Sequence, residues 1–162
     1  MVGQVPGSAG NGIKRIFATS LTEVKTFDAE GLGAIRREGT KAYKYIQYSE
    51  EAAAVDGVAG EVTYYVADTG YPANKVTSDL SASSEVGAGV LMANMSDDEY
   101  GWVQIRGLAT LTIALTAGAD GDTLTPTGSS DGTLDVTASV TDHRCAIAND
   151  ASEDEIICEF PF

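Results

Sequence analysis

The residues best suited to covalent chemistry are one histidine and two cysteines. His143 and Cys145 stand two positions apart, so on a strand they would share a face, where an imidazole can activate a thiol. A hydrolytic triad also needs an orienting carboxylate, and a single histidine removes most serine and cysteine hydrolase schemes. We therefore predict a packed cysteine beside a surface histidine, and a protein that is not an enzyme.

The spacing of the His, Cys, Asp and Gly residues does not favour a metal or cofactor site. His143, Cys145 and Cys158 are too few for a structural zinc site, which takes four ligands. Asp120–Asp122 and Asp131–Asp135 do not match the twelve-residue calcium loop, so we interpret them as turn formers, with loose calcium binding as the alternative. No glycine cluster is followed by the Lys-Ser/Thr of a phosphate-binding loop. We expect no cofactor and no metal.

Cysteine usage and hydropathy bear on the compartment. Two cysteines do not make a disulfide framework, so we expect Cys145 and Cys158 to be free, inward-facing thiols that lie close together. No stretch approaches the roughly 18 to 20 apolar residues that span a bilayer, and the N-terminus lacks the apolar region of a secretion signal. These features predict folding in the cytoplasm and no membrane partner.

Charge is unevenly distributed along the chain. The net charge is −14, which argues against nucleic acid as a partner. Met1–Leu80 carries 8 basic and 10 acidic residues, whereas Ser81–Phe162 carries 2 basic and 14 acidic residues. Four basic residues lie within nine positions: Arg36, Arg37, Lys41 and Lys44. This basic segment predicts either a docking surface for an acidic partner or an ordinary solvated face.

The elements that position these residues are predicted to be strands. Period-two alternation indicates half-buried strands over 42–48 and 61–67, and a three-strand meander over 86–95, 100–106 and 108–115. Further strand-like runs follow Asp120-Gly121 and Asp131-Gly132, which are turn signals. Strands at spacings of roughly 8 to 12 residues predict an all-β, mainly antiparallel sandwich or barrel.

The chain divides into an arm and one domain. Glycine-rich residues 1–12 predict a flexible arm, residues 13–162 a single β-rich domain, and residues 68–85 a long loop or excursion. A short helical turn is expected within Ser49–Ala54. The apolar sets of the strands predict a core made of Val103, Ile105, Leu111, Ile113, Leu115, Ile147, Ile156 and Phe160.

Several segments, taken in order, resemble one family. They are GAGVLMANMSDDEYGWVQIRGLATLTI at 87–113, GADGDTLTP at 118–126, SDGTLDV at 130–136 and EIICEFPF at 155–162, preceded by LGAIRREGTKAYKYIQY at 32–48. Together they are similar to capsid decoration, cement or head proteins of tailed bacteriophages. The most recognisable piece is Tyr100-Gly101-Trp102-Val103 with Gly107 after it.

The resemblance implies a β-tulip or small sandwich domain on the outside of an icosahedral capsid, which it stabilises. The implied partner is the major capsid protein, the implied oligomer a trimer, and the implied location the exterior of a virion assembled in the bacterial cytoplasm. The charge asymmetry predicts attachment through the N-terminal half, with residues 1–12 ordering on contact. The alternative is a receptor- or glycan-binding module such as a fibre head, which exposed Tyr and Trp would also suit.

Overall fold

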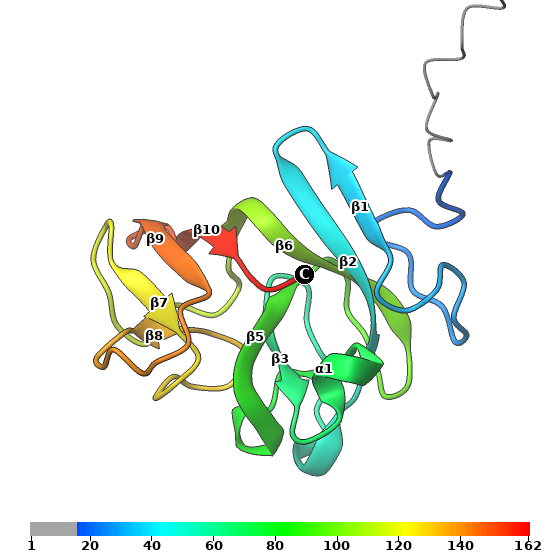
Figure 1. The fold of residues 1–162 in the computed structure, drawn as a ribbon, viewed down its shortest axis with the longest axis horizontal. Coiled ribbons are helices and arrows are strands. Elements are labelled where there is room, and N and C mark those ends of the chain that lie inside the picture. Colours follow the sequence, from blue (N-terminus) through cyan, green and yellow to red (C-terminus); the bar gives the residue numbers. More distant parts are fainter. Residues whose placement is uncertain (1–15) are drawn as a thin grey trace, which may run out of the picture.

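The computed structural model describes residues 16–162. The arm predicted over 1–12 lies outside the described residues. The described chain forms ten strands in one mixed, mostly antiparallel sheet, with one four-residue helix and two 3-10 turns (Figure 1). The all-β, mainly antiparallel class predicted from the sequence is confirmed.

Five strands close into a barrel. The pairing order is β2 (Lys41–Tyr48), β4 (Lys75–Thr77), β3 (Val62–Val66), β5 (Ser83–Leu91) and β6 (Tyr100–Thr110), and β6 pairs back onto β2. All of these pairs are antiparallel except β2–β4. A short strand, β1 (Ile35–Glu38), forms a hairpin with the start of β2. Closure leaves the barrel strands without open edges.

The rest of the sheet grows from the far end of β6. Its last residues pair with β10 (Glu155–Glu159), which continues through β9 (Ala146–Asp150) and β7 (Thr123–Thr125) to β8 (Asp135–Val136). Strand β6 crosses from the barrel into this extension at Gly107, whose φ is +89°. The Gln104 side chain, through Nε2, donates to the carbonyls of Arg106 at 3.1 Å and Leu108 at 2.9 Å. These bonds hold the bend because they satisfy the carbonyls on either side of it.

The predicted strand over 108–115 is wrong beyond Thr110. Segments 100–106 and 108–110 belong to one strand, and 111–115 is irregular. Its backbone bonds to loops rather than to a neighbouring strand: Leu111 N donates to the Asp154 carbonyl at 2.9 Å, and Thr112 N to the Gly60 carbonyl at 3.0 Å. Alternation of residue types cannot distinguish these loop bonds from a ladder.

The main core fills the barrel and continues under the extension. Five of the eight predicted core residues are buried there: Val103, Ile105, Leu111, Ile156 and Phe160. Leu115 is partly buried and packs against this core. The prediction is wrong for Ile113 and Ile147, which are partly buried and do not belong to the cluster. Ile113 and Leu115 lie in the irregular segment, and Ile147 lies between buried Ala146 and Ala148 on the outward face of β9.

A second cluster covers the outside of β2 and β6. It contains Ala34, Tyr43, Tyr45 and Trp102, with Phe17 packed against them. Trp102 Nε1 donates to Thr19 Oγ1 at 2.9 Å, which ties residues 16–34 to the barrel wall. Strand β2 is therefore buried on both faces, whereas the sequence predicted a half-buried strand.

Residues 68–85 are not one long loop. They contain α1 (Gly70–Ala73), β4, the 3-10 turn η2 (Leu80–Ala82) and the start of β5. Val76 and Thr77 of β4 are buried, and this strand closes the barrel between β2 and β3. Three residues are too few to show a period, so no strand could be predicted there from side-chain alternation. The helical turn expected within Ser49–Ala54 is present as η1 (Glu51–Ala53).

Candidate partner-binding surface

The structure separates the four basic residues that the sequence grouped. Lys44 is only 4% exposed, and its Nζ donates to Tyr65 Oη at 2.9 Å. The Nζ atom also lies 5.2 and 5.3 Å from the ring centres of Tyr65 and Tyr71, within cation–π range. Burial lowers the pKa of Lys44. The prediction that Lys44 contacts a partner is therefore wrong for this fold, because its ammonium is enclosed.

Arg36 anchors the chain segment that covers the barrel. Its Nη1 donates to the Thr19 carbonyl at 2.9 Å, and its Nε donates to Glu38 Oε1 at 2.7 Å within an ion pair. The guanidinium lies 5.5 Å from the Phe17 ring centre and 5.9 Å from that of Trp102. These contacts give Arg36 a structural role, and the partner contact that the sequence suggested for it stays a prediction.

Arg37 and Lys41 remain near the surface, where Arg106 joins them. Ala42 of β2 pairs with Arg37 on β1 and with Arg106 on β6, so the two arginines flank it. Both guanidiniums face the Phe162 ring, at 5.4 and 4.8 Å from its centre. Within residues 16–162, none of these three cations has an ion-pair partner.

Two exposed apolar side chains lie next to these cations. Leu108 of β6 and Ile157 of β10 are cross-strand neighbours, and they are 42% and 38% exposed. Ile147 of β9 extends the row as the next partner of Ile157. The residues on the inward face at the next position, Ala109, Ile156 and Ala148, are buried. The extension therefore has a core face and a solvent face whose centre is apolar.

Two shallow hollows join the cations to the apolar row. One, of about 420 Å³, is lined by Lys41, Leu108 and residues around them. The other, of about 440 Å³, is lined by Arg106, Ile157 and residues around them. We call Arg37, Lys41, Arg106, Leu108 and Ile157 the basic–apolar surface. Exposed apolar groups beside unpaired cations suit a protein surface that carries acidic groups.

Sequence reasoning missed three members of this surface. Arg106 and Leu108 flank Gly107, where the bend changes which side chains meet. Ile157 follows Ile156 in a strand, so one of the two must face outward. Two adjacent isoleucines in one strand could have predicted this exposed residue, since the isoleucine that faces outward either packs against a partner or remains exposed.

The thiols and the histidine do not form a reactive pair. Cys145 and Cys158 are free and buried, as predicted. Burial raises the pKa of Cys145, and raises that of Cys158 to about 12, so both stay protonated at neutral pH. His143 lies in the irregular segment before β9, so it does not share a strand face with Cys145. Burial lowers the pKa of His143.

Among residues 16–162, no group of three or more His, Cys, Asp or Glu side chains is arranged to hold a metal ion. No helix in the same range is long and apolar enough to cross a bilayer. Comparison with protein-family models, with curated proteins and with solved structures found no match.

Proposed function

We propose that this chain is a structural virion protein that binds the outside of a tailed-phage capsid and stabilises it. The observation that carries the proposal is the basic–apolar surface. On a chain of net charge −14, three cations that have no ion-pair partner among the described residues lie beside two exposed apolar side chains. Arginine and apolar groups are enriched where proteins bind proteins, and a local positive region steers an acidic partner into register.

The sequence resemblance to decoration and cement proteins supplies the partner. In this proposal the basic–apolar surface contacts acidic groups of the major capsid protein, and most of the acidic remainder of the molecule faces solvent. The chain binds as a homo-oligomer, with a trimer favoured, at the exterior of the virion. The contact lies on β1, β2, β6 and β10, so it draws on both halves of the sequence rather than the N-terminal half alone.

The test is addition of the purified chain to empty expanded capsids of its phage, with bound copies counted after sedimentation. Leu108→Asp with Ile157→Asp should reduce binding at least tenfold, and Arg37→Glu with Arg106→Glu should slow association in a way that fades with salt. Matched controls are Val140→Asp, an exposed apolar residue elsewhere, and Lys75→Glu, a cation 4.0 Å from Glu51. Both controls should bind like wild type.

Two results would contradict the proposal. Wild-type protein that does not add to capsids but is retained on a glycan array would favour the receptor- or glycan-binding alternative. Charge-reversed and apolar-to-acid variants that decorate capsids with wild-type stoichiometry and rate would place the contact elsewhere on the molecule.

A further inference from the structure

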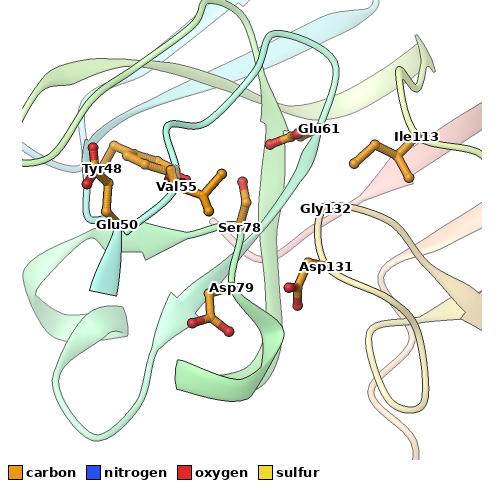
Figure 2. Close-up of a pocket in the computed structure, with 9 residues that line it drawn as sticks. All are labelled: Tyr48, Glu50, Val55, Glu61, Ser78, Asp79, Ile113, Asp131 and Gly132. Carbon is orange, nitrogen blue, oxygen red and sulfur yellow. Dashed lines mark hydrogen bonds between the residues drawn. The ribbon is translucent and has the colours of Figure 1, made fainter. Parts of the chain in front are cut away.

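A small pocket lies between three loops on another part of the surface. Its volume is about 80 Å³. The loops are the one after β2, the one after β4 and the turn before β8. The residues lining it are Tyr48, Glu50, Val55, Glu61, Ser78, Asp79, Ile113, Asp131 and Gly132, drawn in Figure 2. Val55 and Asp131 are exposed, so the pocket opens to solvent between these two loops.

Ser78 is a buried hydroxyl in this pocket, 8% exposed, and the Tyr48 hydroxyl is its hydrogen-bonding neighbour. Within the described part of the chain, no donor reaches the Ser78 Oγ. Figure 2 shows it near the centre, with Tyr48 and Val55 on one side and Glu61 and Asp131 on the other. The neighbouring Tyr48 hydroxyl donates to the Val55 carbonyl at 3.1 Å. A buried acceptor that no donor reaches is unfavourable, so a bound donor group would relieve it.

Three of the four acidic residues that line the pocket hold their loops with one oxygen each. Glu61 accepts from Val58 N at 3.1 Å, Asp131 from Leu80 N at 2.9 Å, and Asp79 from Ser81 N at 2.9 Å. Among the described residues, the second oxygen of each of these three carboxylates has no hydrogen-bond partner. The fourth, Glu50, accepts from Asp97 N at 3.1 Å and shares a hydrogen bond with Asp56. The fold thus fixes the carboxylates through turn bonds and leaves acceptors available at the pocket.

Gly132 keeps the pocket narrow and fixed. Its φ is +70°, and a Cβ there would lie 2.8 Å from Ile113 Cδ1 and 3.2 Å from Glu61 Cγ. Its N–H donates to the Ser78 carbonyl at 3.1 Å, and its carbonyl accepts from Val62 N at 2.8 Å. The turn is therefore held to the barrel from both sides, and only glycine fits there without displacing its neighbours.

Size and chemistry together select the ligand. A cavity of about 150 Å³ admits benzene, so roughly half that volume takes only a few heavy atoms and excludes a sugar ring. The walls from Tyr48, Val55 and Ile113 offer carbon, whereas the polar groups are acceptors. The carboxylates are not grouped as a metal site within residues 16–162. A group with an alkyl stem and an N–H-rich cationic end matches both features.

We propose that this pocket binds the ammonium and last methylenes of a lysine side chain presented by a protein partner. The inference rests on the proposed function only in taking a protein as the source of the lysine. The Ser78 hydroxyl accepts from the ammonium, and the carboxylates around it balance the charge.

The first test uses the full chain and a free probe, Nα-acetyl-lysine methylamide, followed by amide NMR shifts. We expect saturable shifts at Ser78, Gly132 and Val62 with a dissociation constant on the order of millimolar, as suits so small a buried group. The norleucine analogue, which keeps the stem without the ammonium, should give none. Shifts equal for both probes, shifts spread over all acidic turns, or tighter binding by calcium ions would each overturn the proposal.

Variants then assign the site. Asp131→Asn and Ser78→Ala should each weaken probe binding three- to tenfold. Asp142→Asn is the matched control, since Asp142 also accepts from backbone amides, those of Ala138 and Ser139, but lies outside the pocket. Amide spectra report folding in the same samples, so unchanged binding by folded Asp131→Asn and Ser78→Ala proteins contradicts the site.

A third experiment separates this inference from the proposed function. Carbodiimide cross-linking of decorated capsids should join Glu61 or Asp131 to a capsid lysine. Decoration with cross-links only at other positions would reject the lysine pocket and keep the capsid role. Probe binding by a protein that never decorates capsids would keep the pocket's ammonium specificity and reject the capsid role.

Discussion

At the scale of single residues, the buried thiols make stability depend on pH. Burial holds the pKa of Cys158 at about 12 and raises that of Cys145, against an ordinary value of 9.0. The folded state therefore keeps two protons that the unfolded state releases above about pH 9. The stabilising contribution is complete below pH 9 and is lost as pH rises toward the folded pKa.

We expect the free energy of unfolding to fall by about 1.4 kcal/mol per pH unit for each thiol in that window. Urea unfolding at several alkaline pH values measures this slope. Cys158→Ala should make the slope shallower, because one titrating group is removed. An equal slope in the variant and the wild type would mean that other groups dominate the alkaline transition.

Lys44 is another buried titrating group, and it changes stability with pH in the opposite direction to the thiols. Because burial lowers the pKa of Lys44, the folded state binds its proton less tightly than the unfolded state does. The charged ammonium therefore lowers stability at neutral pH, and this penalty fades as pH rises toward its ordinary value of 10.5. Lys44→Met keeps the stem without the charge.

Thermal unfolding of Lys44→Met at pH 7 should give a melting temperature equal to or above that of wild type, and its advantage should shrink at high pH. Lys25→Met, at a partly exposed lysine paired with Glu23, is the control and should change little. A marked loss of stability in Lys44→Met would show that the contacts with Tyr65 and Tyr71 outweigh the burial of the charge.

At the scale of elements, the bend at Gly107 joins the barrel to its extension and places the basic–apolar surface at their junction. A Cβ at this residue would lie 3.0 Å from the Thr40 carbonyl oxygen, in a backbone conformation with φ of +89°. We expect Gly107→Ala to lower the free energy of unfolding by about 1 to 3 kcal/mol. Gly39, with φ of +58° and nothing within 4 Å, is the matched control.

Gly39→Ala keeps the cost of placing a side chain at positive φ but adds no steric contact. Urea unfolding should therefore show a smaller loss of unfolding free energy for this variant. Equal losses in the two variants would mean that close packing of the β1–β2 turn against β6 does not contribute to the free energy of unfolding.

Segment 111–115 offers a further test of how an irregular run contributes to the core. Leu111 is buried, whereas Ile113 is partly exposed beside the pocket. Leu111→Ala should cost about 2 to 5 kcal/mol, and Ile113→Ala clearly less, in denaturant unfolding. A loss for Ile113→Ala as large as that for Leu111→Ala would instead support the shared core face that strict alternation predicts.

These elements also show what the sequence can and cannot predict. Alternation identified β2, β3 and the first part of β6, because their side-chain types follow strand phase. It missed β4, since three residues carry no period. It also misjudged the exposure of Lys44, because Tyr65 of β3 and Tyr71 of α1 enclose its ammonium only after folding. Charge spacing grouped Arg37 with Lys41, but Arg106 joins them through the β2–β6 register and Ile157 through the β6–β10 register, which no local pattern contains.

At the scale of the whole molecule, net charge opposes compactness. The chain carries 24 acidic and 10 basic residues, and the described part has four ion pairs. Local crowding is visible at Glu50, whose pKa is raised by a hydrogen bond with Asp56 and by the nearby charge of Asp97. Repulsion of this kind acts over the Debye length, about 30 Å at 0.01 M salt and about 8 Å at 0.15 M.

We therefore expect the melting temperature at pH 7 to rise as sodium chloride is raised from about 0.01 to about 0.15 M, because screening weakens self-repulsion more than it weakens the few surface pairs. Calorimetry measures the shift. Asp56→Asn should raise the melting temperature at low salt and shrink the salt-dependent rise, since it removes one member of the crowded group around Glu50. Asp142→Asn, an acid held by turn amides outside that group, controls for the loss of one charge. A melting temperature that falls with salt would mean that attractive pairs, rather than net repulsion, set the stability of this acidic barrel.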